Sequence, residues 1–468
     1  MSRFSDCLQA RKFCVLLEYL PAAKHAAPAR ASFAGCPAFM TLADRVQADD
    51  DPAPLEAAAA YPEAADQVLH YSGKGRDIAD FEKFLGQAKA RGLCSLLLLS
   101  GDKLKQHNDG RLQPELRSRY LESVNMVMAA RRDPDFNIGV AFNPFKYAEA
   151  ERDAQYFKLQ KKLKAGADYI ITQLGFDLEA LKQAKDFLAQ EHYHQPILAC
   201  VMPLTLARAQ FMHRRKVAGI VLTPHALQLL EREQQADAAQ AERNVYLRCA
   251  LQILICRHWG FAGVHVSACH KASEQRKLED ALQQLQALSL EECLQRWHAL
   301  WQLRTGQELR PEVAVFSRRA PVSQVLKYKN LHAMHELFFS SRAAKGIGGL
   351  IFNAPLWNKP QAEEALLKTE FISKHGALGC ESCGQCRIGE TLYICPETCP
   401  KGLANGPCGG SSLDRCEFGD RECIHSVKAR LAKSVAQTEI LKAELIPTVA
   451  IETRSTSSWK NWFKAPQL

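Results

Sequence analysis

The chain has 468 residues, of which 47% are hydrophobic and 24% charged, and its formal net charge is +9. This length fits two or three domains, and this hydrophobic fraction is typical of a folded soluble protein. No apolar run approaches the ~18 residues that a membrane span needs, and dispersed basic residues with few aromatics argue against a nucleic-acid partner. The positive charge serves solubility or attracts an anionic small ligand.

Short apolar segments alternate with helical patterns over the first 267 residues. The strand candidates are residues 13–20, 43–48, 67–72, 95–100, 137–142, 168–174, 196–202, 219–222 and 263–267. Helical patterns between them include residues 77–90, 113–130, 148–165 and 226–259. Such alternation predicts an α/β fold with a parallel sheet. This number of units favours a (β/α)8 TIM-type barrel, with an open doubly wound sheet as the alternative.

Polar residues occur at the ends of most predicted strands. In a (β/α)8 barrel, functional side chains lie at the C-terminal ends of strands. The candidates here are Glu18, Asp49 and Asp50, His70, Gly101 and Asp102, Asn143, Gln173, and Ser267. Glu18 is the most unusual, because a carboxylate within the apolar residues 15–20 is costly to bury unless it is paired or functional.

The region after the predicted barrel is helical. Residues 288–303 predict one helix, and residues 328–341 a second one carrying His332 and His335, which we interpret as surface or packing residues. Residues 346–349, Gly-Ile-Gly-Gly, lack the strand–turn–helix context of a dinucleotide-binding loop, so we predict a turn. The predicted division is a barrel at 1–287, a helical extension at 288–375, a cysteine-rich domain at 376–432, and a C-terminal helix and tail at 433–468.

Eight of the seventeen cysteines cluster near the C-terminus. They are Cys380, Cys383, Cys386, Cys395, Cys399, Cys408, Cys416 and Cys423. Thiolates bind Zn²⁺ or iron–sulfur clusters, usually four to a site, so eight cysteines allow two sites. The first three have the spacing that opens a bacterial ferredoxin ligand set, although the next interval is longer. The spacing does not say which cysteines share a site.

A disulfide-stapled knot is the alternative interpretation of these cysteines. Residues 1–6 do not begin a signal-peptide pattern, and many further cysteines lie outside the cluster. Both observations favour a reducing cytoplasm, where metal binding is the expected use of clustered thiols.

Four segments of the predicted barrel carry a specific pattern. They are residues 17–21, 99–102, 138–144 and 162–173, the last combining a lysine-bearing helix, an Ala-Gly-Ala turn and a strand that ends in Thr-Gln. With these segments, roughly residues 10–285 resemble the methylenetetrahydrofolate reductase family. Residues 376–430 are similar to a C-terminal domain of some members and to their iron–sulfur partner subunits, most distinctively at 399–402 and 406–410.

The resemblance implies a flavin, FAD or alternatively FMN, that reduces 5,10-methylenetetrahydrofolate to 5-methyltetrahydrofolate. It implies that Glu18, with a raised pKa, protonates N10 of the folate, that Asp102 lies near flavin and pterin, and that Gln173 binds the pterin edge. The cofactor-binding residues that it implies are His70, Gly101, Asp102, Asn143, Tyr147 and Lys162.

Three of the positions that contact flavin differ from the family pattern. Ser100 replaces an arginine, Asn143 a tyrosine and Tyr147 a histidine. These differences leave the flavin type and the use of NADH open.

The resemblance also implies partners. These are tetrahydrofolate derivatives and, if the cysteines hold [4Fe–4S] clusters, a ferredoxin or flavoprotein electron donor. With zinc instead, the domain would be a structural or docking module. We expect an oligomer or a complex subunit. Two other functions stay open: a methyl-folate-handling protein of a demethylation or corrinoid pathway, and a non-catalytic subunit that docks a redox partner.

Overall fold

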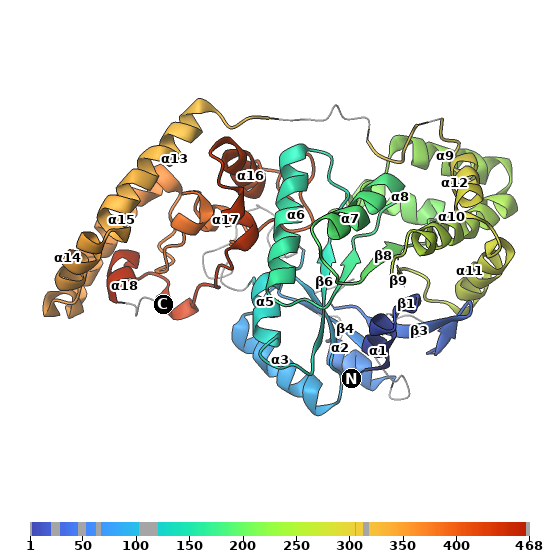
Figure 1. The fold of residues 1–468 in the computed structure, drawn as a ribbon, viewed down its shortest axis with the longest axis horizontal. Helices are drawn as coiled ribbons and strands as arrows, with labels where there is room; N and C mark the ends of the chain where they lie inside the picture. Colours follow the sequence, from blue (N-terminus) through green and yellow to red (C-terminus); the bar gives the residue numbers. More distant parts are fainter. Residues whose placement is uncertain are drawn as a thin grey trace.

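The first part of the chain forms a closed parallel barrel (Figure 1). The computed structural model describes residues 2–19, 29–44, 53–61, 67–102, 120–304, 306–311 and 318–464. The eight parallel strands are β1 (Cys14–Tyr19), β3 (Cys36–Leu42), β4 (Gln67–Ser72), β5 (Ser95–Leu99), β6 (Asn137–Phe142), β7 (Tyr169–Thr172), β8 (Ile197–Val201) and β9 (Gly263–Val266). The barrel closes because Val15 of β1 lies opposite both Ala38 of β3 and Val264 of β9. The predicted (β/α)8 barrel is confirmed, and the open sheet is excluded.

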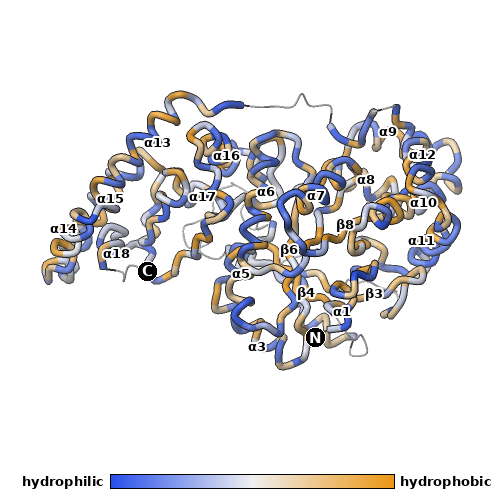
Figure 2. Tube along the Cα trace, in the orientation of Figure 1, coloured by the Kyte–Doolittle hydropathy of each residue, from blue (hydrophilic) through white to orange (hydrophobic). Residues whose placement is uncertain are grey.

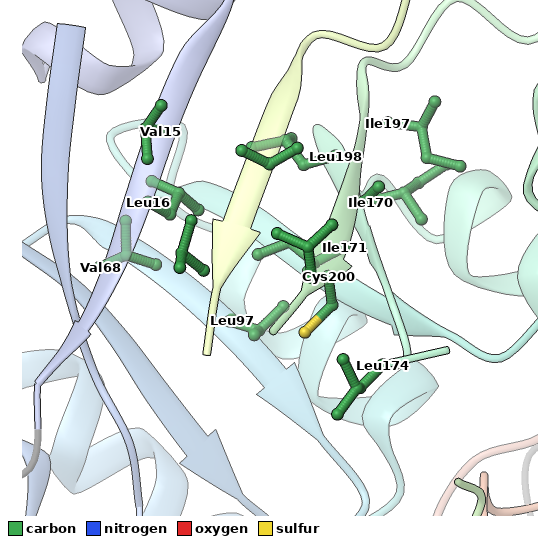
Figure 3. Close-up of a cluster of buried hydrophobic side chains, with 14 of the residues drawn as sticks. Val15, Leu16, Val68, Leu97, Ile170, Ile171, Leu174, Ile197, Leu198 and Cys200 are labelled. Atoms are coloured by element: carbon green, nitrogen blue, oxygen red, sulfur yellow. The ribbon is translucent and has the colours of Figure 1, made fainter. Parts of the chain in front are cut away.

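Helices surround the strands (Figure 1). Those of the barrel region are α1 (Arg3–Gln9), α2 (Pro54–Ala59), α3 (Ile78–Ala90), α5 (Ser123–Ala130), α6 (Glu149–Lys164), α7 (Leu178–Gln190), α8 (Leu206–Arg215), α9 (Pro224–Ala236), α10 (Ala238–His258), α11 (Ala272–Leu285) and α12 (Leu290–Leu300). Apolar residues are concentrated along the strands (Figure 2). A close-up of this core shows buried side chains from β1, β4, β5, β7 and β8 packed together (Figure 3).

Two predicted strands are wrong. The second strand is not at residues 43–48 but just before them, at β3, and residues 45–48 lie outside the described ranges. Pro37 argues against a strand there, yet it lies at the start of β3, opposite Ser32 of the short antiparallel β2 (Ser32–Phe33). Residues 219–222 form a connection between α8 and α9, because an apolar run of four residues does not distinguish a strand from a half-buried loop.

Two predictions about helices are also wrong. The predicted helix at 226–259 is split at Asp237, whose extended backbone and side chain cap α10 by accepting from the amides of Ala239 and Gln240 at 2.9 and 3.0 Å. Residues 346–349 are not a turn but lie inside α14 (Arg342–Phe352). Gly348 permits close packing there, since a Cβ at this position would lie 2.3 Å from the Phe463 ring.

Gly139 provides a test of packing in the barrel wall. A Cβ there would lie 2.2 Å from Cζ of Tyr169, whose hydroxyl donates to the Leu96 carbonyl at 2.6 Å. We predict that Gly139→Ala lowers the free energy of unfolding by ~1–3 kcal/mol in urea denaturation, because the buried ring has to move. The control is Gly86→Ala in α3, where nothing lies within 4 Å of the added Cβ. Equal effects of the two substitutions would contradict this account.

The helical, cysteine-rich C-terminal region packs against one side of the barrel. Its helices are α13 (Val322–His335), α14, α15 (Pro360–Leu378), α16 (Ile424–Ser434), α17 (Thr438–Ala443) and α18 (Ser458–Lys464). Both α16 and α17 contact α6, and Figure 1 shows α16 beside that helix. His332 and His335 pack against Tyr393, consistent with their interpretation as packing residues. In the described ranges, no helix is long and apolar enough to cross a membrane.

Candidate functional site

A buried polar cluster lies inside the barrel, where an apolar core would be expected. Thr41 Oγ1 lies 3.0 Å from Nε2 of His265, and Cys200 Sγ lies 3.4 Å from Nδ1 of the same ring. The ring of His70 is 5.6 Å from that of His265, centre to centre. The strand register explains why these side chains lie close together, since Glu18 lies opposite Thr41, and Cys200 lies opposite His265. The cluster therefore joins four strands near the ends that carry function in this fold.

Glu18 is held as a hydrogen-bonded carboxylate at the edge of this cluster. Its Oε2 accepts from Ser267 Oγ at 2.8 Å and from the Ala268 amide at 3.0 Å, and His270 Nε2 lies 3.9 Å away. Burial opposes ionisation, but His265, these hydrogen bonds and His270 outweigh it, so the pKa of Glu18 lies below its usual value. The structure therefore does not show the raised pKa that was expected for this carboxyl.

The two buried histidines resist protonation. Burial, reinforced by His265, lowers the pKa of His70 to about 3, and burial also lowers the pKa of His265. Within the described part of the chain, Nε2 of His70 has no hydrogen-bond partner. A buried polar atom without a partner is costly, and a bound ligand would remove that cost.

Three other predicted site residues already have partners in the protein. Lys162 donates from α6 to the Ala141 carbonyl at 2.5 Å, and burial, followed by the charge of Lys158, lowers its pKa to about 7. The Tyr147 hydroxyl donates to Asp177 at 3.1 Å. Oε1 of Gln173, directly after β7, accepts from the amide of the next residue at 2.9 Å.

The remaining predicted positions lie where the C-terminal region meets the barrel. Lys401 donates to the Gly101 carbonyl at 2.8 Å and to Glu417 at 2.5 Å. Nδ2 of Asn143 donates to the carbonyls of Gly219 and Gly409 at 2.9 and 3.0 Å. Two positions expected to contact a cofactor thus also hold the cysteine-rich region at this end of the barrel.

Asp102 follows Gly101 at the same end of β5. Its side chain keeps contact with solvent, yet the protein atoms crowded around it raise the pKa of its carboxyl. The nearby Lys401 opposes this rise, and Glu417 adds to it. Asp49 and Asp50, also predicted at a strand end, lie outside the described residues.

Sequence reasoning missed several members of the cluster. Thr41 was missed because its strand was predicted too late in the chain. His265 and Cys200 lie within predicted strands, where a polar residue in an apolar run was the available signal. No pattern in the sequence indicated that Lys401 would contact a residue 300 positions away.

The eight clustered cysteines line two small cavities. Cys380, Cys383, Cys386 and Cys395 surround one of them. Cys399, Cys408, Cys416 and Cys423 surround the other. Among the described residues, no three Cys, His, Asp or Glu side chains are already close enough together to hold a metal ion.

A much larger cavity of about 1000 Å³ lies at the N-terminal ends of the barrel strands, opposite the end that carries Glu18. It is lined by residues that precede strands, among them Phe13, Phe136 and Ala262. Because catalytic groups of (β/α)8 barrels lie at the other end, we do not assign the reaction to this cavity.

Two family models match the chain. The model described as "Methylenetetrahydrofolate reductase" matches residues 29–283, and that described as "Methylene-tetrahydrofolate reductase C terminal" matches residues 360–451.

Individual proteins are similar over shorter stretches. "Methylenetetrahydrofolate reductase 1" of Schizosaccharomyces pombe is 26% identical over 183 residues, which are 39% of this chain and 30% of that protein. "Probable methylenetetrahydrofolate reductase (NADPH)" of Caenorhabditis elegans is 30% identical over 180 residues, which are 37% of this chain and 26% of that protein. The chain thus spans less than a third of these relatives. An uncharacterized Clostridium thermocellum protein that binds two copies of 5-methyl-5,6,7,8-tetrahydrofolic acid aligns with a TM-score of 0.40 and 11% identity, over 60% of this chain and 98% of that one.

Proposed function

Because this chain belongs to the methylenetetrahydrofolate reductase family, whose model matches residues 29–283, we propose that it interconverts 5,10-methylenetetrahydrofolate and 5-methyltetrahydrofolate with a bound flavin. The observation that carries the proposal is the Glu18 carboxylate, held by Ser267 and Ala268 at the C-terminal end of β1. A positioned carboxyl at this edge of a barrel suits proton transfer to a substrate nitrogen.

The buried Nε2 of His70, which has no hydrogen-bond partner among the described residues, supports a cofactor at this end of the barrel. We propose FAD, with His70, Asp102 and Lys162 among the residues that would hold it. When bound, the flavin supplies the hydride for the one-carbon unit. Glu18 holds the proton for N10, Gln173 binds the pterin edge, and the neutral His70 places no positive charge beside the rings.

Glu18 has to carry a proton when it acts as an acid, yet its pKa is low in the free protein. We propose that the folate excludes water from the carboxylate, which disfavours its charge, so that Glu18 takes up a proton as the folate binds. The uptake should approach one proton per folate near pH 7. It should vanish as the pH falls below the pKa of Glu18 in the free protein, because the carboxyl is then already protonated.

Isothermal titration calorimetry in buffers of different ionisation enthalpy measures this uptake. Glu18→Gln should bind the folate without taking up a proton. Equal uptake by Glu18→Gln and the wild type would contradict the assignment.

Electron supply is a further part of the proposal. We propose that the cysteine-rich domain holds [4Fe–4S] clusters and receives electrons from a ferredoxin or flavoprotein, with structural zinc as the alternative. Support comes from Lys401 and Gly409, which bring this domain to the catalytic end of the barrel. None of the seventeen cysteines, all of which lie in the described ranges, forms a disulfide, which supports the proposed reducing cytoplasm.

Anaerobic purification tests the cofactor set. A visible spectrum with flavin bands, together with iron and acid-labile sulfide, supports a reductase that receives electrons through its own iron–sulfur clusters. Flavin with zinc supports a reductase that carries a structural module. Metal without flavin would overturn the flavin-dependent proposal.

A second candidate function is a methyl-folate-handling barrel without an obligatory flavin. It is favoured by the use of Asn143 and Gly101, both expected to contact flavin, as contacts for the cysteine-rich domain. Stable 5-methyltetrahydrofolate binding by flavin-free protein would support it. An obligatory flavin would exclude it.

A further inference from the structure

The structure sorts the clustered cysteines in a way that their spacing does not reveal. The cavity inside the first four is lined by residues of 370–397 together with Ser458, and the cavity inside the last four by residues of 399–425. Neither cavity is lined by a cysteine of the other set. The boundary falls between Cys395 and Cys399, which lie on either side of the short 3-10 helix Pro396–Thr398.

The chemistry of the four donors in each cavity suits a thiolate-bound metal centre, and the thiols would have to move closer together to share an ion. Four thiols form the usual complement for zinc or an iron–sulfur cluster. Each cavity is also lined by a cation: Lys374 in the first, whose Nζ lies 3.8 Å from Cys386 Sγ and also pairs with Glu370, and Arg421 in the second, which also pairs with Asp420. Such donors around ligating sulfurs are typical of metal sites.

We infer that the eight cysteines form two four-thiolate metal centres divided in chain order. The outer set is Cys380, Cys383, Cys386 and Cys395, and the inner set is Cys399, Cys408, Cys416 and Cys423. Although only three residues separate them, Cys395 and Cys399 belong to different centres.

The inner set is the one that contacts the barrel. Its Cys408 carbonyl accepts from Gln155 Nε2 of α6 at 2.8 Å, and the neighbouring Gly406 and Gly409 carbonyls accept from Lys158 and Asn143. The outer cavity is lined only by residues of the C-terminal region. The inner centre is therefore the one next to the catalytic end of the barrel. Its use in electron delivery rests on the proposed function, whereas the division of ligands does not.

Metal content of double variants tests the division. In the anaerobically purified full chain, Cys380→Ser/Cys395→Ser and Cys399→Ser/Cys423→Ser should each retain about half of the iron or zinc, because each removes one centre. Cys395→Ser/Cys399→Ser should lose nearly all of it, because it damages both. Cys36→Ser, outside both sets, should retain the wild-type content. The inference is overturned if Cys395→Ser/Cys399→Ser retains half.

Thiol labelling of the wild type tests the same division without any substitution. The metals are removed stepwise with EDTA, with ferricyanide added if iron is present, and exposed thiols are alkylated and located by mass spectrometry. Cys395 and Cys399 share one tryptic peptide, between Arg387 and Lys401, and its fragment ions distinguish them. The two cysteines should become labelled in different phases, each with its own set. Simultaneous labelling of both would overturn the division.

Gln155→Ala tests the position of the inner set. Loss of its hydrogen bond to the Cys408 carbonyl should speed labelling of the inner set ~5-fold and leave the outer set unchanged. Gln183→Ala, on the exposed face of α7, is the control and should change neither. Faster labelling of the outer set by Gln155→Ala would overturn the assigned position. These readouts do not use reductase activity, so failure of the proposed reaction would be recognised separately.

Discussion

Replacing Glu18 by glutamine is expected to lower turnover of 5,10-methylenetetrahydrofolate by ~10²–10⁴-fold at an unchanged fold. Glutamine keeps the size of the side chain but cannot deliver a proton to N10. It can still accept the hydrogen bonds that Glu18 accepts from Ser267 at 2.8 Å and from Ala268 at 3.0 Å. The measurement is steady-state formation of 5-methyltetrahydrofolate by protein reduced with dithionite or a photochemical donor.

Glu82→Gln is the matched control for this substitution. Glu82 lies on the exposed side of α3, where it pairs with Arg132 at 3.4 Å, and its loss should leave turnover within experimental error. Circular dichroism and folate affinity should be the same for both variants and the wild type. If Glu18→Gln retains full turnover, Glu18 is not the acid. If wild type and variant are both inactive with flavin bound, the docking-subunit alternative gains support.

The largest effect on stability is expected from Glu122→Ala. Glu122 is buried before α5, where it pairs with Lys158 at 2.8 Å and accepts from the amides of Ala404 and Asn405 at 3.1 and 3.0 Å. Its removal deprives the buried Lys158 ammonium of its carboxylate, leaving a hydrogen bond to the Gly406 carbonyl, and it deprives two backbone amides of this acceptor. We expect a loss of ~3–5 kcal/mol in the free energy of unfolding, measured by urea denaturation at pH 7.

Glu149→Ala provides the matched control. Glu149 pairs with Lys433 at 2.7 Å across the same two regions, but with substantial solvent exposure. Its loss should cost ~0–1 kcal/mol. Equal losses for the two variants would show that the buried pair stabilises the contact between the barrel and the C-terminal region no more than the exposed pair does.

The contribution of Glu122 should depend on pH. Burial alone would raise its pKa, but Lys158 and the amides of Asn405 and Ala404 outweigh burial, so the pKa lies below its usual value in the folded protein. The stabilisation is therefore fully present above the unfolded pKa of ~4.3 and is lost as the pH falls through the folded pKa. Glu122→Gln and wild type should differ most near neutral pH and converge as the pH falls below the folded pKa of Glu122.

The barrel could be predicted from the sequence because its strands are short, apolar and separated by helices. The exceptions have local causes. Pro37 argues against a strand, yet it lies at the start of β3, and the apolar residues 219–222 resemble a strand although they form a loop. Asp237 ended one helix and began another within a continuous helical pattern, which only its capping geometry reveals.

The candidate site could be predicted only in part. Glu18 and His70 stood out as polar residues within apolar strands. Their surroundings depend on strand register and on contacts between distant residues, such as Thr41 with His265, and Gly101 with Lys401. The low pKa of Glu18 also follows from Ser267 and its neighbours, which no local pattern connects with that carboxyl.

A single-turnover reaction tests the central claim most directly, because it needs no knowledge of the natural electron donor. Anaerobically purified protein is reduced photochemically, mixed with excess 5,10-methylenetetrahydrofolate, and followed by flavin absorbance and by chromatography of the folates. We predict reoxidation of the flavin with formation of about one 5-methyltetrahydrofolate per two electrons delivered, and a markedly slower reaction for Glu18→Gln. Protein that binds reduced flavin and folate yet forms no 5-methyltetrahydrofolate would contradict the account.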